Sequence, residues 1–187
     1  MKHLSKVDLS SCIRLTDLSG LTGAYSVRLV GCVGLQTNAF QCLSHVRKLD
    51  VSFCPGVTDT RPFANVHTLV LNSCPITDVS SLGSVHSLSL TNCTLLHDVS
   101  ALRNCHYLNL TNCTGITNVS SLSSVHTLRG ASTINGADHI QQSARWGELR
   151  RTQNTVEKEG KTGRVRYTLA KMINDQWIDD QRSRSVV

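Results

Sequence analysis

The chain has 187 residues, of which 40% are hydrophobic and 17% are charged, so it can bury a core and carries too few charges for a disordered polyelectrolyte. Aromatic residues make up only 4% of the sequence, so a core must be built mainly from Leu, Val, Ile and Cys, which favours a thin layered architecture. The net charge of +6 is modest, and the Lys and Arg residues are not clustered into a basic stripe along the sequence. We therefore expect no nucleic-acid partner.

A repeat of about 20 residues runs through the first two thirds of the chain. In each unit a cysteine is preceded by apolar residues three, five and eight positions earlier, as Leu71, Leu69 and Val66 precede Cys74. After the cysteine most units continue with a segment such as ITDVSSL at 76–82. The cysteines at this position are Cys12, Cys32, Cys54, Cys74, Cys93 and Cys113, separated by 20, 22, 20, 19 and 20 residues.

Each unit predicts a short strand followed by a turn and a return. The alternation of apolar and polar residues before the cysteine has a period of two, which is typical of a strand with one buried face. In the stretch that follows, apolar residues such as Ile76, Val79 and Leu82 recur every three positions, which favours a helical or 3₁₀ turn. A single unit cannot offset the entropy of its own ordering, so stability must come from stacking of neighbours.

The spacing LxxLxLxxCxxITDxSxL, in six consecutive units between residues 3 and 128, resembles the leucine-rich-repeat family and its short internalin type, with Cys where Asn is more usual. The resemblance implies an α/β-type repeat solenoid, a right-handed superhelix with a parallel β-sheet on the concave side and short turns or 3₁₀ segments on the convex side. It also implies that the concave face binds a protein. Two departures stand out, because no recognisable cap precedes residue 3 and the seventh unit, VHTL at 125–128, reaches Gly130 where an inward Leu is required. We therefore divide the chain into a solenoid at 1–128 and a divergent tail, partly helical or disordered, at 129–187.

If the family geometry holds, the polar positions beside each strand centre project from the concave sheet. Arg28, Lys48, Asp50 and Tyr107 are the strongest candidates for specificity, since Arg and Tyr are enriched among the residues that dominate binding energies. An ordinary solvated sheet face remains the alternative for each position. The predicted partner-binding residues are Lys6, Asp8, Arg28, Lys48, Asp50, Asn72, Thr91, Tyr107, Asn109 and Thr111.

The repeated cysteines predict an inward column of small apolar side chains whose thiols bond weakly to the corner backbone. Zinc is disfavoured because the sequence has no CxxC pair, only a lone CxxH formed by Cys42 and His45. Disulfides between units are disfavoured because side chains in register on parallel strands point the same way. Reduced cysteines, and the lack of a signal-peptide segment or of an apolar run long enough to span a bilayer, predict a cytoplasmic protein without a membrane partner.

Two further columns accompany the cysteines. The histidines, His67, His86, His106 and His126, form either a pH-sensitive surface or a set of partly exposed residues that titrate independently. The aspartates, Asp17, Asp59, Asp78 and Asp98, with Asn118 in the next unit, predict caps that accept backbone N–H groups. Calcium binding by the aspartates is disfavoured because the glycine-rich loops of calcium-binding β-solenoids are absent.

The tail carries two helix candidates, a weak one at 138–158 and an amphipathic one at 165–181. The second would seal the open end of the solenoid or bind a partner, or else belong to a disordered tail. We predict no enzyme and no cofactor or metal, because GKT at 160–162 lacks the glycine of a phosphate-binding loop at position 155 and no Glu precedes Glu148. The predicted function is a protein-binding module; the alternative is a fragment of a larger surface or effector protein in which the repeats act as a spacer.

Overall fold

The computed structural model describes residues 6–130 of the chain. The two segments for which helices are predicted, 138–158 and 165–181, lie outside the described residues.

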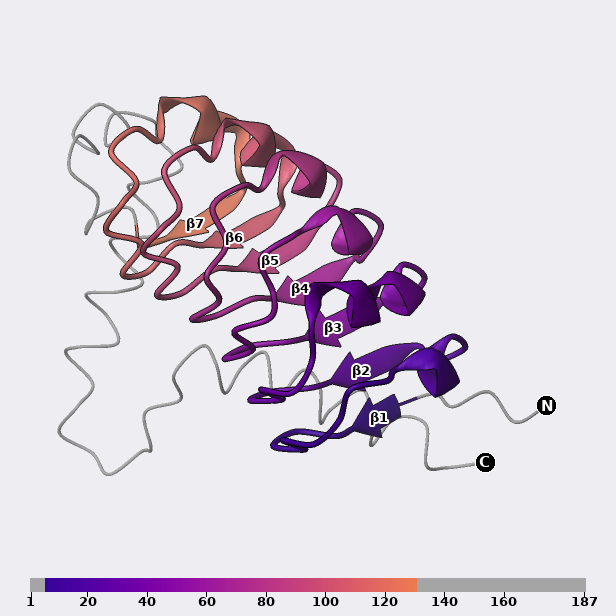
Figure 1. Ribbon diagram of the computed structural model, residues 1–187. Helices are drawn as coiled ribbons and strands as arrows, with labels where there is room; N and C mark the ends of the chain where they lie inside the picture. Colours follow the sequence, from indigo (N-terminus) through magenta and orange to yellow (C-terminus); the bar gives the residue numbers. More distant parts are fainter. Residues whose placement is uncertain (1–5, 131–187) are drawn as a thin grey trace, which may run out of the picture. The chain divides into compact units, whose positions relative to one another are not determined.

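Seven three-residue strands form one parallel sheet in which each strand pairs with the next along the chain (Figure 1). The pairing aligns the central apolar residues, for example Leu49 with Leu69 and Leu69 with Leu88. This register follows from the sequence pattern, because a slip of one residue would turn every apolar side chain to the outer face. The strands are β1 (Lys6–Asp8), β2 (Ser26–Arg28), β3 (Lys48–Asp50), β4 (Thr68–Val70), β5 (Ser87–Ser89), β6 (Tyr107–Asn109) and β7 (Thr127–Arg129).

Short 3₁₀ segments run along the side of the solenoid opposite the sheet (Figure 1). The Asp column begins them: an Oδ1 oxygen of Asp78 accepts the backbone N–H of Ser80 at 2.8 Å, and Asp98 does the same for Ser100. Asn118 accepts the equivalent bond from Ser120 at 2.9 Å. The predicted bonds from these side chains to backbone N–H groups are therefore confirmed, although each Asp or Asn lies one residue before the N-cap position, which is held by Val79, Val99 or Val119. The segments are η1 (Ser19–Leu21), η2 (Thr37–Leu43), η3 (Arg61–Phe63), η4 (Ser80–Leu82), η5 (Ser100–Asn104) and η6 (Ser120–Ser124).

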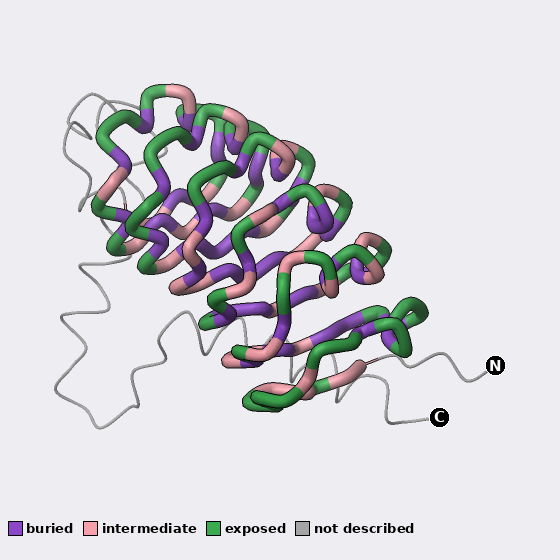
Figure 2. Tube along the Cα trace, in the orientation of Figure 1, coloured by how far each residue is buried: buried purple, intermediate pink, exposed green. Residues whose placement is uncertain are grey.

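The core fills the space between the sheet and the 3₁₀ segments, where buried residues recur at the same place in each unit (Figure 2). Leu69, Leu88 and Leu108, at the strand centres, have no exposed surface. Phe40 and Phe63, in η2 and η3, are fully buried and meet edge to face with ring centroids 5.7 Å apart. The core is thus a stack of thin layers, each completed by its neighbours.

Five of the six repeated cysteines form the predicted inward column, and each of these five thiols bonds to the rung before it. The prediction is wrong for Cys12, which lies in the first rung and is exposed. The Sγ of Cys54 donates to the carbonyl oxygen of Leu29 at 3.1 Å, and the Sγ of Cys113 donates to that of Leu90 at 2.9 Å. All eight cysteines are free thiols. Burial raises the pKa values of Cys74 and Cys93 to about 12, so these thiols stay protonated and serve as donors.

The corner that follows each strand turns through a left-handed residue just before the cysteine. Three of the six positions hold Gly or Asn, which accept this conformation readily, two hold Ser, and the sixth holds the bulkiest residue, Phe53, with φ 59°. The positions are Ser11, Gly31, Phe53, Ser73, Asn92 and Asn112, with φ between 57° and 71°.

The seventh unit contributes a full strand, β7, which runs one residue past the boundary expected at 128. Gly130 follows it with φ 80°, and a Cβ at this position would collide with the backbone of Leu110 and Thr111. The glycine that looks like a break in the repeat pattern therefore lies after the strand, where the backbone turns close against the preceding rung.

Candidate functional site

Two columns of side chains flank the buried strand centres and face away from the core on the concave sheet. Seven of the ten predicted site residues lie in these columns, and Asn72, Thr91 and Thr111 lie two residues beyond the second one. The first column is Lys6, Ser26, Lys48, Thr68, Ser87, Tyr107 and Thr127. The second is Asp8, Arg28, Asp50, Val70, Ser89, Asn109 and Arg129.

Arg28 and Asp50 form an ion pair across neighbouring strands, with Nε of the arginine 3.5 Å from Oδ2 of the aspartate. Asp50 also accepts hydrogen bonds from the backbone N–H and the hydroxyl of Ser52, at 3.1 and 2.7 Å. Burial raises the pKa of Asp50, and the bonds from Ser52 and the charge of Arg28 oppose that effect only in part. Asp50 is therefore bonded to partners within the fold, whereas the side chain of Arg28 is partly exposed.

Other predicted residues hold the ends of the strands. Asn109 accepts both the backbone N–H and the hydroxyl of Thr111, at 3.1 and 2.6 Å, and Asp8 serves Ser10 in the same way. Asn72 reaches the next rung, where its Oδ1 accepts the backbone N–H of Thr91 at 2.9 Å. The acidic and amide oxygens of these residues thus already accept hydrogen bonds within the fold. The groups of the concave face suited to a partner are therefore its hydrogen-bond donors and the aromatic ring of Tyr107.

Three buried polar atoms of the concave face have no hydrogen-bond partner among residues 6–130: Ser26 Oγ, Tyr107 OH and Arg129 Nε. Tyr107 and Arg129 lie on the adjacent strands β6 and β7. Burial raises the pKa of Tyr107, although the positive charge of Arg129 lowers it in part, so the phenol is a donor at neutral pH. A buried donor without an acceptor is costly, so these atoms are local exceptions to the hydrogen bonding of the face.

Arg129 is absent from the residues predicted from the sequence because the repeat pattern places the end of the solenoid at 128. The sequence identifies Arg129 by its position in the repeat. Arg129 directly follows VHTL at 125–128, just as Asn109 directly follows CHYL at 105–108 one unit earlier. Its register partner in the sheet is Asn109.

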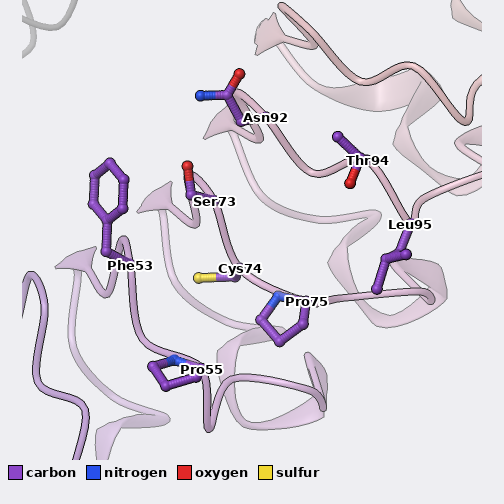
Figure 3. A pocket seen from close by; sticks show the side chains of 8 residues that line it. All are labelled: Phe53, Pro55, Ser73, Cys74, Pro75, Asn92, Thr94 and Leu95. Atoms are coloured by element: carbon purple, nitrogen blue, oxygen red, sulfur yellow. The ribbon is translucent and has the colours of Figure 1, made fainter.

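A groove of about 480 Å³ lies on the corner after the strands, across the third to fifth rungs (Figure 3). None of its lining residues is charged. Phe53 and Leu95 stand at its edges with exposed fractions of 57% and 50%. The repeat pattern does not indicate this groove, because Phe53 and Leu95 depart from the residues that other units have at their positions. The lining residues are Phe53, Pro55, Ser73, Cys74, Pro75, Asn92, Thr94 and Leu95.

The histidine column forms a continuous stack. Ring centroids are 4.7 Å apart between His67 and His86, 4.8 Å between His86 and His106, and 4.4 Å between His106 and His126, with interplanar angles of 11° to 17°. His67 is half-buried and the other three are exposed. Burial, followed by the charges of Arg47 and His86, lowers the pKa of His67.

Within residues 6–130 no group of three or more His, Cys, Asp or Glu side chains is placed to hold a metal ion. Across the same residues the structure contains no helix that is both long enough and apolar enough to cross a bilayer.

No protein-family model matches the sequence, and no curated protein matches it. Among solved structures, internalin C2 of Listeria monocytogenes is similar over 67% of this chain and 60% of its own length, with 22% identity and a TM-score of 0.52. An internalin F from the same species matches 67% of this chain and 53% of its own length, with 20% identity and a TM-score of 0.43. The functional domain of InlJ, described as including a cysteine ladder, matches 67% of this chain and 41% of its own length, with 13% identity and a TM-score of 0.35. The chain therefore has the leucine-rich-repeat solenoid fold found in internalin C2 and spans about 60% of the length of that protein.

Proposed function

We propose that this chain is a protein-binding module that engages its partner with the concave face of the sheet. The observation that supports this most directly is the pair of buried donors that have no acceptor among residues 6–130, Tyr107 OH and Arg129 Nε, on adjacent strands of that face. Native folds leave few such groups unsatisfied, and a bound protein can satisfy them with backbone carbonyl or carboxylate oxygens when the two side chains turn outward to meet it.

The chemistry of the face fits a protein ligand. Tyr107 provides a half-buried aromatic ring beside a guanidinium, and Arg28 provides a second, partly exposed guanidinium four strands away. Tyr and Arg are the residue types that most often dominate the energy of protein interfaces. The oxygens of Asp8, Asp50 and Asn109 support the strand ends, so we expect them to shape the face without contributing most of the binding energy.

We also infer that the module works in a reducing compartment such as the cytoplasm. Each buried thiol of the repeated column is used as a donor to the preceding rung, for example that of Cys93 to Leu71 at 3.2 Å. Oxidation of such a thiol would remove the donor and place a larger group in a packed interior.

The test is capture of partner proteins on the immobilised full-length chain. Wild type is compared with Arg28→Ala/Tyr107→Ala and with a matched convex-side control, Thr77→Ala/Ser100→Ala, whose sites are exposed. We expect the same protein to be recovered by wild type and control, and its recovery to fall about tenfold or more with the concave variant, because loss of one hot-spot residue costs roughly 2 kcal/mol. Equal recovery by all three chains would contradict the proposal and would favour the role of a spacer.

A further inference from the structure

The four stacked histidines lie at one edge of the concave face. Each directly precedes the first residue of a strand, so His67, His86, His106 and His126 border β4, β5, β6 and β7. Arg47 holds the same place before β3 and is exposed. These five side chains form a strip along the solenoid axis, which we call the histidine strip.

The charged groups that face the histidine strip are cationic. Arg47 and Lys48 on the β3 rung act electrostatically on His67. Of the 3₁₀ segments that lead into the four strands, η4 and η6 carry no charged residue, η5 carries Arg103, and η3 carries Arg61, which is paired with Asp59 at 2.9 Å. On the strands themselves, the titratable groups of β6 and β7 are Tyr107 and Arg129.

Carboxylates are held away from the strip by partners of their own. Asp59 binds Arg61, Asp98 caps η5 through the N–H of Ser100, and Asp78 caps η4 through that of Ser80. Asp50 binds Ser52 and Arg28. Within residues 6–130 no ion pair joins a histidine to a carboxylate, so no carboxylate of these residues competes with an external anion at the strip.

The stacking places like charges close together whenever neighbouring rings are protonated. Two imidazolium rings at a centroid distance of 4.4 to 4.8 Å repel each other. An anionic group placed along the ring edges relieves this repulsion. Binding of an anion and uptake of protons therefore favour each other, and the favourable range is the one in which histidine ordinarily titrates, between about pH 5 and 8.

We propose that the histidine strip binds an acidic segment of the protein partner, and that this binding tightens as the pH falls from 7.5 to 5.5. This inference rests on the proposed function, since it assigns the chemistry of one edge of the same binding face. An extended polypeptide rises about 3.3 Å per residue, so a run of four to five acidic residues spans the stacked rings from His67 to His126.

The probe is a rhodamine-labelled peptide with five consecutive Glu residues between Gly-Ser flanks, and its matched control has five Gln residues. Binding to the full-length chain is followed by fluorescence anisotropy at pH 5.5, 6.5 and 7.5 and constant ionic strength. We expect the Kd for the Glu peptide to be about tenfold lower at pH 5.5 than at pH 7.5, as an average uptake of about half a proton on binding over these two pH units predicts. The Gln peptide should show no measurable binding.

Two double variants identify the groups responsible. His86→Gln/His106→Gln interrupts the strip and should remove most of the pH dependence. His45→Gln/His97→Gln changes two histidines outside the stack and should retain it. Thermal melts at pH 5.5 and 7.5 confirm that each variant is folded under the conditions of the binding measurement. If the strip variant does not fold, the single change His106→Gln is used, with a smaller pH effect expected.

A Kd independent of pH, or a pH effect lost equally in both double variants, would overturn the inference. So would a short single-stranded oligonucleotide with five phosphates that binds as tightly and with the same pH slope, because the assignment to an acidic polypeptide would then be wrong. The two proposals are contradicted by different results. Capture of the partner that is unaffected by Arg28→Ala/Tyr107→Ala contradicts binding at the concave face. The binding of the Glu peptide depends on the histidines alone and tests only the histidine strip.

Discussion

The Sγ of Cys93 donates a hydrogen bond to the carbonyl oxygen of Leu71, 3.2 Å away in the preceding rung. The same bond joins Cys32 to Leu9, Cys54 to Leu29, Cys74 to Val51 and Cys113 to Leu90. Each thiol thereby donates to a carbonyl group at the corner where the strand has ended, and the carbonyls of Leu9, Leu29, Leu71 and Leu90 also accept the backbone N–H of the cysteine three residues later. The column links successive rungs through the interior without a covalent bond.

Replacing Cys93 by Ala should lower the free energy of unfolding by roughly 1–2 kcal/mol, because it removes a buried donor and leaves a small void. Urea denaturation followed by circular dichroism measures the change. The control is Cys12→Ala, since Cys12 is exposed and should tolerate the substitution within about 0.5 kcal/mol. Equal effects of the two substitutions would show that the column contributes nothing specific to stability.

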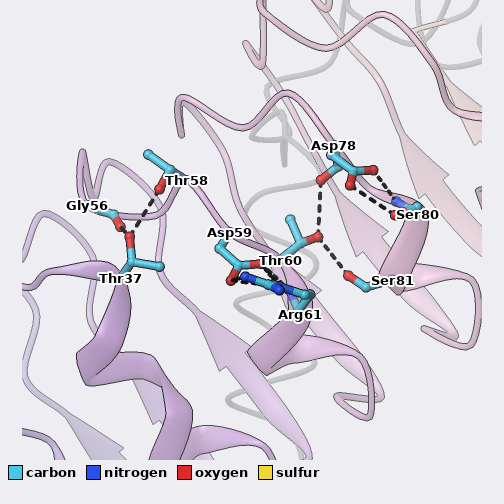
Figure 4. Close-up of polar contacts among 9 residues, drawn as sticks. All are labelled: Thr37, Gly56, Thr58, Asp59, Thr60, Arg61, Asp78, Ser80 and Ser81. Carbon is cyan, nitrogen blue, oxygen red and sulfur yellow. Dashed lines mark hydrogen bonds and ion pairs between the residues drawn. The ribbon is translucent and has the colours of Figure 1, made fainter.

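A buried hydroxyl links two rungs on the convex side (Figure 4). Thr60 Oγ1 donates to the carbonyl oxygen of Asp78 at 3.1 Å and lies 2.7 Å from the hydroxyl oxygen of Ser81. Thr60→Val keeps the shape of the side chain and removes both bonds, so we expect a loss of about 1–2 kcal/mol in the free energy of unfolding. Thr77→Val, at an exposed position, serves as the control, and a loss at Thr77 as large as that at Thr60 would count against the link between rungs.

Acid should destabilise the solenoid through its capping aspartates. The backbone N–H of Ser100 and its side chain hold the pKa of Asp98 below its ordinary value, and Ser19 does the same for Asp17. A carboxyl with a lowered pKa in the folded state contributes stability above its ordinary pKa of about 3.9, and loses that contribution as the pH falls through the folded value. The melting temperature should therefore drop between pH 5 and pH 2.5.

The variant Asp17→Asn/Asp98→Asn tests this assignment, because Asn118 shows that an amide accepts the same N–H bond. The amide does not titrate, so the variant should lose less melting temperature than wild type over the same pH range. An identical acid transition in both chains would mean that other groups govern it.

Phe53 occupies a left-handed conformation, with φ 59°, that costs a residue with a bulky side chain roughly 1 kcal/mol. Its ring is 57% exposed, so burial returns little of that cost. Phe53→Asn should raise the free energy of unfolding by about 0.5–1 kcal/mol, since Asn is the residue at this position in two later units. Phe53→Ala keeps a Cβ in the same conformation and should give no gain; a gain as large as that of Asn would contradict the explanation by backbone strain.

The fold follows from the sequence because one position of the repeat determines all the others. With Cys74 in the interior, Leu71 and Leu69 must also face inward, and a shift of one residue would expose the whole column. The capping by Asp78 and the stacking of the histidines follow in the same way, since residues that share a position in the repeat share a neighbour in space.

The details of the candidate site depend on burial and on local departures from the repeat, which the pattern does not contain. Asp50 looks like an exposed acid in the sequence, yet its neighbours bury it against Arg28 and Ser52. Tyr107 OH is buried without a hydrogen-bond partner among residues 6–130, which the repeat pattern does not indicate. Arg129 is not among the predicted residues because Gly130 breaks the repeat pattern and suggests that the repeats end before it. The strand β7 is nevertheless complete, since it ends at Arg129, one residue before the glycine.

Photo-cross-linking from single positions tests the concave binding face most directly. A benzophenone amino acid is placed at Ser87, in the first outward column of the sheet, or at Ser100, on the convex side, in the full-length chain with its captured partner. A partner bound to the concave face should be cross-linked from Ser87 and not from Ser100. A cross-link from Ser100 alone would show that the partner lies on the convex side and would contradict the assignment.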